Sequence, residues 1–443
     1  MRSIAKTLMG AAAIGLVLSG CAGDSSGGDG DTQTLRIAYK KADPVLEQLM
    51  QNTKEQFEAA NDGVTVELAP IEGNDEDYAT KLALSQRSPD TAPDVFVEDS
   101  FKLRADVDAG YVLQLDDYLA DWEDWDTFNE TAKQAGLGDD GGTYAVPLET
   151  DTRVIWYNQN VLGEAGIELP WQPETWDDLL TMARTVKAAN PEVVPFSMYA
   201  GTMQSFYELL YGTEDGTLYD EDEQKWVTGS QGFTDSLAFL KTIYDEELAV
   251  TPAEALDPNV WQKIVGEMLP QDLMGATVEG SYAPQFWQEG ADYEWPEYSE
   301  VMATTPFPTQ DGQEPGAVSM SGGWTLAVGA GTEDPELAVD FVKTAMDYEN
   351  SLAYTVDASK IAVRTDVAEA PEYQDMNPFA AEVTEVLDVS NYRPATADFA
   401  EIDTAVLTAT QEVVAGGKSP EEAAKTYDET LLKIVGEENV VEK

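Results

Sequence analysis

The chain has 443 residues, of which 84 are Asp or Glu, 25 are Lys or Arg and none is His, so its formal net charge is −59. The absence of histidine excludes Ser-His-Asp and Cys-His catalytic arrangements and every metal site with a histidine ligand. Such an acidic chain repels nucleic acid and anionic lipid headgroups, and its length suits two large lobes better than one domain.

The first twenty residues have the layout of a secretion signal. Arg2 and Lys6 form a short positive region, and residues 8–20 are apolar or small throughout, a run too short to span a membrane. The only cysteine of the chain, Cys21, follows in the sequence LSGC. This tetrapeptide resembles the lipobox of bacterial lipoproteins, in which the cysteine is acylated and becomes the mature N-terminus. We predict a lipoprotein signal peptide at 1–20 and lipidation at Cys21; the alternative is an incidental cysteine in a cleaved leader.

Residues 21–33 are polar and glycine-rich, without apolar periodicity, and predict a flexible tether. The reach of such a tether is roughly 20 Å. Two acyl chains, at about 0.8 kcal/mol per buried CH₂, anchor a protein stably where one chain does not. We therefore expect the folded body close to the outer face of a membrane. With Cys21 lipidated, no cysteine remains for a disulfide or a thiolate metal site.

After the tether, strands alternate with helices. Residues 34–40 alternate as a strand does, and residues 44–61 carry apolar side chains on one helical face. A second strand is predicted at 64–70, and a third at 93–99 leads into a helix that ends near Gly110. This alternation predicts a mainly parallel sheet, with ligands at the carboxyl ends of its strands.

The pattern changes at residues 143–167, where one strand runs into another and then into a helix. The next helix begins with Thr175 as its N-cap and Asp178 three residues later, a variant of the capping box. Carboxylates cluster at 73–78 and 219–224, but neither cluster has the spacing of a calcium loop. We therefore predict no metal site and no cofactor.

Five segments carry a family resemblance. They are PLETDTRVIWYNQNVLGEAGI, PETWDDLLTMARTV, GATVEGSYAPQFW, SMSGGWTLAVGAGTEDPELAVDFVKTAM and NYRPATADFAEIDTAV. In this order they resemble the family 1 extracellular solute-binding proteins of ABC importers, the group that contains maltose-type sugar receptors. The resemblance implies an α/β fold of two lobes, of the type II periplasmic-binding-protein kind, with a hinge that the chain crosses several times. By position, one lobe takes residues 34–148 and 322–355, and the other takes 149–321 and 356–443.

The resemblance also implies a function. We expect a receptor, not an enzyme, that binds a carbohydrate between its lobes and delivers it to the permease subunits of an ABC transporter. An oligosaccharide is the favoured ligand. We expect the protein to be monomeric, to be held at the extracellular face of the cell membrane by its lipid anchor, and to bind no nucleic acid.

A sugar offers hydroxyls to polar groups and apolar C–H faces to aromatic rings, and an unpaired buried hydroxyl costs about 1–3 kcal/mol. The resemblance places candidate residues for both at strand ends and hinge crossings. Candidates at strand ends of the first lobe are Tyr39, Lys40, Glu98 and Asp99. Glu149 and Asp151 lie where the chain first crosses to the other lobe, and Tyr199 follows a later strand. For the acids among them the alternative is a solvated loop, and Arg153 is expected to pair with one of them.

Four further candidates come from the same resemblance. Tyr282 matches an aromatic platform position, and Trp324 follows two glycines at the hinge, where ligand contact and hinge packing compete. Arg393 matches a position that donates hydrogen bonds to sugar hydroxyls in relatives, and Phe399 is a candidate for a second platform.

Other readings of the sequence remain open. Polyols, glycerol phosphate, polyamines and peptides are alternative ligands of such a receptor. A phosphate ester needs several basic groups, for which only Lys40, Arg153 and Arg393 are candidates. The alternative from another class is an anchored glycoside hydrolase with two carboxylates, whose separation of about 5 or 6.5–9.5 Å cannot be read from a sequence.

The acidic residues are spread along the chain and do not form a tail, which argues against a disordered acidic arm. Their mutual repulsion destabilises the fold at low ionic strength, whereas at about 1 M salt the Debye length falls to roughly 3 Å. We therefore predict a protein from a salt-rich habitat; tuning of solubility alone is the alternative.

Overall fold

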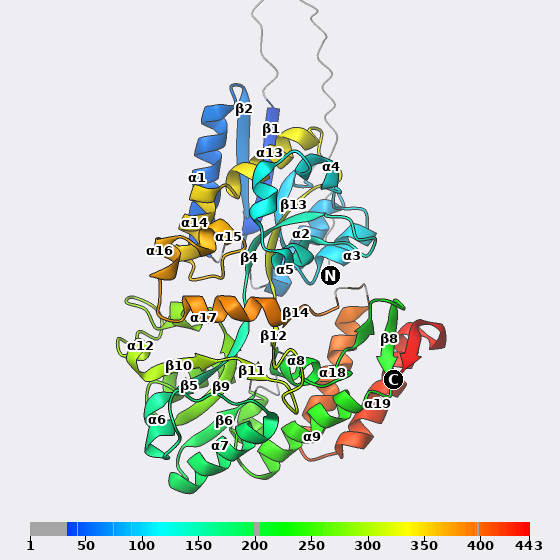
Figure 1. The fold of residues 1–443 in the computed structure, drawn as a ribbon. Helices are drawn as coiled ribbons and strands as arrows, with labels where there is room; N and C mark the ends of the chain where they lie inside the picture. The colour runs from blue at the N-terminus through cyan, green and yellow to red at the C-terminus, as the bar shows by residue number, and fades with distance from the viewer. Residues whose placement is uncertain are drawn as a thin grey trace, which may run out of the picture.

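The computed structural model describes residues 33–41, 43–73, 75–89, 91–198, 204–257, 259–394, 396 and 398–443. The predicted signal peptide, nearly all of the tether and Cys21 lie outside the described residues, as does Tyr199. The described chain forms two α/β lobes, one above the other in Figure 1. Within the described part of the chain, no helix combines the length and the apolar character needed to span a membrane.

Lobe 1, the upper lobe in Figure 1, is built on a five-stranded sheet of order β2-β1-β3-β13-β4. Its strands are β1 (Gln33–Lys40), β2 (Val64–Ile71), β3 (Val95–Asp99), β4 (Ala145–Thr150) and β13 (Gly323–Val328). Strand β1 pairs in parallel with β2 and β3, but β13 runs antiparallel to β3 and β4. The strands predicted from the sequence, β1, β2 and β3, are parallel as expected, and β4 runs in the same direction, but β13 is reversed. The sheet is mixed because β13 enters it from the hinge side, after the chain has built most of the other lobe.

Helices cover both faces of this sheet, and the main ones are α1 (Pro44–Ala60), α2 (Asp75–Gln86), α3 (Leu103–Asp108), α13 (Pro335–Ala345) and α14 (Tyr348–Asp357). Helix α1 begins where the Asp43 side chain accepts hydrogen bonds from the next backbone N–H groups, with Pro44 in the first turn. Its buried residues are Leu46, Leu49, Met50, Thr53 and Phe57, which confirms the predicted helical face. The Phe57 ring meets that of Phe341 on α13 edge to face, with 5.4 Å between centroids.

Lobe 2 is built on a four-stranded sheet of order β10-β5-β9-β6. Its strands are β5 (Arg153–Asn158), β6 (Val194–Ser197), β9 (Met274–Gly280) and β10 (Met302–Thr305). Every residue of β5 and β9 is buried, as expected for central strands covered on both faces. Two three-stranded sheets complete the lobe: β11 (Phe307–Pro308), β12 (Ala317–Met320) and β14 (Ser390–Asn391); and β7 (Tyr219–Asp220), β8 (Lys225–Thr228) and β15 (Val440–Glu442).

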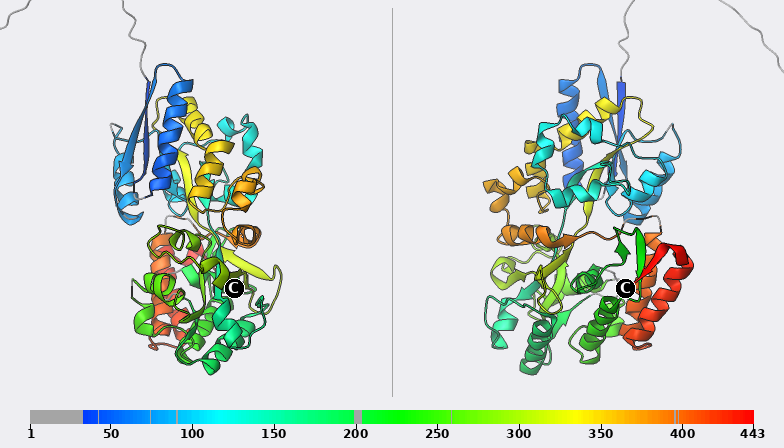
Figure 2. Two further views of the ribbon diagram at one scale, coloured as in Figure 1. Left: turned by 90° about the vertical axis from the view of Figure 1, so that its left-hand side faces the viewer. Right: turned by 45° about the vertical axis from the view of Figure 1, so that its right-hand side comes forward.

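The longer helices of lobe 2 surround its sheets (Figure 2). They are α6 (Gln159–Glu164), α7 (Trp176–Ala189), α8 (Gln204–Tyr211), α9 (Gln231–Asp245), α17 (Ala380–Glu385), α18 (Phe399–Val414) and α19 (Pro420–Val435). Helix α7 begins with the predicted capping box: Thr175 accepts from the Asp178 backbone N–H, and the Asp178 side chain accepts in return from Thr175. This prediction is confirmed.

The remaining helices are short. They are α4 (Asp116–Leu119), α5 (Glu130–Lys133), α10 (Pro252–Ala255), α11 (Val260–Lys263), α12 (Tyr298–Val301), α15 (Thr365–Ala368) and α16 (Pro371–Gln374). The 3₁₀ helices are η1 (Glu123–Thr127), η2 (Gln134–Gly136), η4 (Ala283–Phe286), η5 (Val386–Val389) and η6 (Glu437–Asn439), and η3 (Ile264–Met268) is a π-helix.

The chain passes between the lobes from β4 to β5 and from β12 to β13, and it returns to lobe 2 before α17. This return comes later than residue 356, the position expected from the sequence. Ala358 and Val363 pack in the core of lobe 1, and α15 and α16 lie beside α14 in that lobe (Figure 1). Ile361, which forms a bridge with Thr150 at the crossing, contacts the core of lobe 2, and Phe379 is the next apolar residue after it that packs there. The apolar residues after α14 therefore keep the chain with lobe 1 for longer.

Candidate binding site between the lobes

The edge of lobe 1 that faces lobe 2 is formed by the ends of three paired strands. Strand β13 starts there, and its Trp324 lies in register with Asp99 at the end of β3 and with Glu149 near the end of β4. Gly323, immediately before it, has φ of +141°, and a Cβ at this position would lie 2.2 Å from the Glu149 carbonyl oxygen. Only glycine allows this approach. The tight crossing thus brings an indole ring and two carboxylates to one edge.

The Trp324 ring is contacted by an aromatic residue and by a lysine of lobe 1. The ring packs edge to face on Tyr78, with 5.8 Å between centroids, and Lys40 Nζ lies 5.6 Å from the ring centroid. Tyr78 is fixed by a hydrogen bond from its hydroxyl to the Val97 carbonyl. Trp324 is only half-buried, so part of the indole remains available to a ligand.

Two other candidates in lobe 1 have buried side chains. Tyr39 is 1% exposed and belongs to the core, because strand alternation turns it opposite to Lys40. Glu98 is 2% exposed, and burial raises its pKa well above the usual value, with the nearby carboxylates of Asp106 and Asp99 adding to the effect. The structure does not bring Tyr39 or Glu98 to the surface between the lobes.

Buried ion pairs lie at the first crossing. Glu149 accepts hydrogen bonds from the Tyr354 hydroxyl and from Lys360 Nζ, the latter at 3.0 Å, and Asp151 pairs with Arg153 at 2.5 Å. Burial alone would lower the pKa of Lys360, but the charge and hydrogen bond of Glu149 outweigh it and raise that pKa. Glu149 is therefore committed to a cation of its own chain.

The Tyr282 ring lies beside both cations. Arg153 Cζ is 5.3 Å and Lys360 Nζ is 5.7 Å from its centroid, distances at which a cation is attracted to an aromatic ring. Burial raises the pKa of Tyr282, so the phenol stays protonated and can donate a hydrogen bond. Tyr282, the predicted platform residue, thus lies on the side of lobe 2 that faces lobe 1, next to the ion pairs Arg153–Asp151 and Lys360–Glu149.

Arg393 connects the two lobes directly. Its guanidinium Cζ lies 3.7 Å from the ring centroid of Phe101, which follows β3 in lobe 1, and 3.9 Å separates its Nη1 from Asp403 of α18. A second contact between the lobes joins Arg104 of α3 to Glu221 of the β7–β8 hairpin at 3.8 Å. Phe101 is itself tied to the strand end, because its backbone N–H donates to Asp99.

Phe399, the second candidate platform, has a different setting. It is 7% exposed and stacks on Trp226, with 6.5 Å between centroids, within the core of lobe 2. Its contact with the site is indirect, because Arg393 Cζ lies 5.9 Å from its ring. The structure therefore places Phe399 behind Arg393.

Glu208 is a feature of the site that sequence reasoning missed. It is fully buried on α8, and its Oε1 accepts from the Met320 N–H, while its Oε2 has no hydrogen-bond partner among the described residues. Burial raises its pKa to about 8, although Arg153 and Arg393 oppose the shift. The one available signal was a lone acid in the otherwise uncharged helix QSFYELLY. Lys360 and Phe101 carried no local signal.

We call the residues that meet here the interlobe cluster: Lys40, Asp99, Phe101, Glu149, Asp151, Arg153, Glu208, Tyr282, Trp324, Lys360 and Arg393. Three of its cations are matched by carboxylates. Besides Glu208, the Nε atoms of Arg153 and Arg393 and the hydroxyl of Ser321 are buried without a hydrogen-bond partner in the described chain. Such atoms can be satisfied by a polar, uncharged molecule that both accepts and donates.

The family model described as bacterial extracellular solute-binding protein matches residues 42–350. Among curated proteins, a probable ABC transporter-binding protein of Deinococcus radiodurans is 25% identical over 67% of this chain and 70% of its own length. The diacetylchitobiose binding protein DasA of Streptomyces coelicolor is 28% identical over 61% of this chain and 60% of its own length. An arabinooligosaccharide-binding protein of Halalkalibacterium halodurans is 26% identical over 66% of each chain. The matches thus span about two thirds of these relatives.

Solved structures resemble the chain over most of its length. The GacH receptor of Streptomyces glaucescens, solved unliganded and with acarbose, superposes with a TM-score of 0.75 at 22% identity and covers 91% of this chain and 99% of its own. The sugar-binding protein MalE of Xanthomonas citri reaches a TM-score of 0.77 at 18% identity, over 90% of this chain and 98% of its own. These likenesses confirm the expected fold of two α/β lobes.

Proposed function

Since the chain belongs to the bacterial extracellular solute-binding proteins, we propose that it is a receptor that binds an oligosaccharide between its two lobes and delivers it to an ABC transporter. Curated relatives are named for diacetylchitobiose and arabinooligosaccharide, and both names denote short, hydroxyl-rich chains. The candidate site supports the same class of ligand through its charges, its rings and its hydrogen-bonding atoms.

The observation that carries the proposal is the pairing of charge in the interlobe cluster. Lys360 lies 3.0 Å from Glu149, Arg153 lies 2.5 Å from Asp151, and Arg393 faces Asp403. An anionic ligand would have to compete with these carboxylates, and a cationic ligand with these basic groups. A neutral ligand disturbs neither, which places sugars and polyols above phosphate esters and polyamines.

Aromatic rings supply the apolar half of sugar recognition. Tyr282 in lobe 2 and Trp324 in lobe 1 are both half-buried, so each keeps a part of its ring accessible. Covering one face of such a ring contributes about 2–3 kcal/mol, roughly half of what full burial gives. Two platforms in different lobes suit a ligand longer than one sugar unit.

Closure of the lobes is the step that marks the loaded receptor. A ligand drives closure only when it binds the closed form more tightly than the open form. The contact of Arg393 with Phe101 joins lobe 2 to lobe 1 beside the binding residues, so it would stabilise the closed form that the ligand prefers. No covalent step is required, and we propose that the protein is not an enzyme. Glu149 and Asp151 are each engaged by a cation, which leaves neither free for acid catalysis.

The anchor belongs to the same proposal. Acylation of Cys21, followed by the tether of residues 21–33, would hold the receptor at the extracellular face of the cell membrane as a monomer. An extracellular receptor near the membrane surface remains within reach of the permease that it serves.

A calorimetric panel of neutral mono- and oligosaccharides, in about 1 M salt to screen the acidic surface, tests the proposal. We expect stoichiometric binding of at least one oligosaccharide without products, and the Tyr282→Ala variant should bind it roughly thirtyfold more weakly. Tyr348→Ala is the matched control, because Tyr348 is 39% exposed on α14, outside the interlobe cluster. Binding of charged solutes alone, or equal binding by both variants and the parent, would contradict the proposal.

A further inference from the structure

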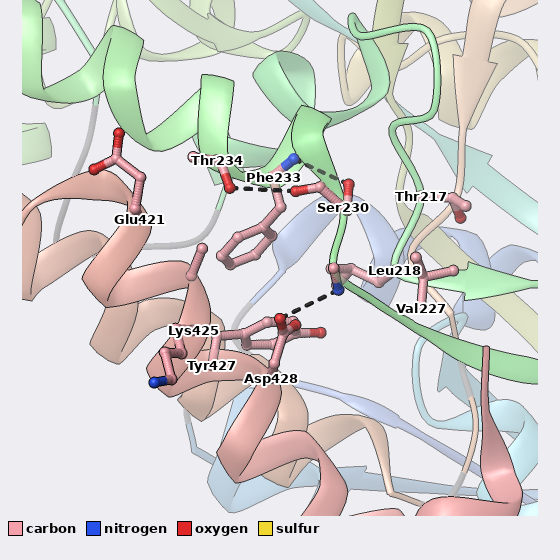
Figure 3. A pocket seen from close by; sticks show the side chains of 12 residues that line it. Thr217, Leu218, Val227, Ser230, Phe233, Thr234, Glu421, Lys425, Tyr427 and Asp428 are labelled. Atoms are coloured by element: carbon pink, nitrogen blue, oxygen red, sulfur yellow. Dashed lines mark hydrogen bonds between the residues drawn. The ribbon is translucent and has the colours of Figure 1, made fainter. Parts of the chain in front are cut away.

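A pocket of about 160 Å³ lies in lobe 2, between α9, α19 and the strand β8 (Figure 3). It shares no lining residue with the interlobe cluster. Its apolar wall includes Leu218, Val227 and Ala424, and its polar groups include Tyr427 and Asp428 on α19. An apolar cavity of about this size holds one benzene molecule, so the pocket has room for about six non-hydrogen atoms.

Tyr427 brings an unsatisfied hydroxyl to this pocket. The residue is 3% exposed, and its ring stacks on that of Phe233, with 4.4 Å between centroids and 17° between planes. Its hydroxyl has no hydrogen-bond partner in the part of the chain that the structure describes. Burial, with the nearby charge of Asp428, raises the pKa of Tyr427. The group therefore remains a phenol, whose oxygen can accept a hydrogen bond.

Asp428 adds a carboxylate that has no ion-pair partner among the described residues. It is half-buried, and within the described residues its one hydrogen bond comes from the Gly229 backbone N–H at 3.2 Å. Burial raises its pKa, and the carboxylate of Glu442 adds to the shift. Lys425 does not compensate, because it extends away from Asp428 (Figure 3) and its Nζ lies 4.0 Å from Glu429. A cation beside Asp428 would offset both the cost of burying its charge and the repulsion from Glu442.

We propose that this pocket binds a small primary alkylammonium ion. Its ammonium group donates hydrogen bonds to the Asp428 carboxylate and to the Tyr427 hydroxyl oxygen, and its alkyl part lies on Leu218, Val227 and Ala424. A neutral molecule of the same shape fits the apolar wall but gains no charge-assisted hydrogen bond, which is about twice as strong as a neutral one. The site is thus selective for charge, in contrast to the interlobe cluster.

The test is a titration of the purified protein with n-butylammonium chloride, with 1-butanol as the neutral isostere, in about 1 M sodium chloride to suppress diffuse attraction to the acidic surface. We expect saturable binding of n-butylammonium and none of 1-butanol. Asp428→Asn keeps an acceptor for the Gly229 N–H and should weaken binding about tenfold, and Tyr427→Phe should weaken it several-fold. Glu429→Gln, the same charge change one residue further along α19, should leave it unchanged.

Three results would overturn the proposal. They are equal binding of n-butylammonium and 1-butanol, absence of saturable binding, and an effect of Glu429→Gln as large as that of Asp428→Asn. The first two need no variant, so they hold even if a substitution disturbs folding. Saccharide binding should be unchanged in all three variants, because the pocket and the interlobe cluster share no residue. The outcome is therefore independent of the proposed receptor function.

Discussion

Cations are used differently between the lobes and on the outer surface. In the interlobe cluster, the side chains of Arg153 and Lys360 are 6% and 16% exposed, and those of their partners Asp151 and Glu149 are 16% and 6% exposed. On the surface, Lys41 and Glu72 form a pair whose side chains are 45% and 76% exposed. The chain has 25 basic residues against 84 acidic ones. Arg153 and Lys360 neutralise carboxylates in the interlobe cluster, while the outer surface keeps an excess of acidic residues.

The two regions should therefore respond to different changes. Exposed pairs contribute about 0–1 kcal/mol and are screened by salt, whereas removal of one partner from a buried pair leaves an uncompensated charge. Salt should act on the surface and on overall stability, and substitutions should act on the cluster.

The largest effect is expected from Lys360→Met, which leaves Glu149 and the Tyr354 hydroxyl without the cation. We expect the free energy of unfolding to fall by about 3–5 kcal/mol. The matched control is Lys41→Met, which breaks the exposed pair with Glu72 and should change stability by less than about 1 kcal/mol. Urea denaturation of both variants measures the difference. Equal, small losses would show that the buried pair is no different from a surface pair.

A pH-dependent effect is expected at Glu208. Its pKa is about 8 in the folded protein, above that of an unfolded glutamate, so folding takes up a proton between these values. Stability from this residue is present below the unfolded pKa and is lost as the pH rises through about 8. Glu208→Gln cannot ionise, and at about pH 9 we expect it to be more stable than the parent by roughly 2–4 kcal/mol.

Denaturation curves over a range of pH measure this change, and the two proteins should converge near pH 5. A constant difference between them at every pH would mean that Glu208 does not titrate as described. Glu279→Gln serves as a comparison, because Glu279 is a second buried acid in the same lobe and accepts hydrogen bonds from Trp261 and Gly280.

A smaller effect is expected from the contact that joins the lobes. Phe101→Leu and Arg393→Met should each weaken saccharide binding by about five- to thirtyfold, because a cation–π contact contributes about 1–2 kcal/mol when desolvated. The double variant should lose less than the sum of the two, with a coupling of about 1 kcal/mol. Calorimetry on the four proteins gives this cycle. Full additivity would show that the contact does not form in the bound state.

Local patterns in the sequence predicted much of the fold. The apolar face of α1, the capping box of α7 and the succession of β4, β5 and α6 are all fixed by neighbouring residues, and the structure confirms them. The antiparallel direction of β13 was not predicted, because it depends on where the chain re-enters lobe 1. The late return to lobe 2 likewise depends on packing among α14, α15 and α16.

The candidate site was predicted in part for the same reason. Lys40, Asp99, Asp151 and Trp324 lie at strand ends or crossings, which periodicity and family resemblance can locate. Lys360 is 211 positions from Glu149, and no local pattern announces that pairing. Tyr39 and Glu98 were candidates because they lie at strand ends. Their side chains are buried, because alternate residues of a strand point into the lobe.

The central claim is that an uncharged saccharide binds in a site whose own charges are paired. The most direct test is to measure its dissociation constant and the protein's unfolding temperature in about 0.15 M and in about 1 M salt. We predict that stability rises with salt as the surface repulsion is screened, while the dissociation constant changes by less than about twofold. A dissociation constant that moves tenfold or more with salt would mean that net charge drives binding, and would contradict the account.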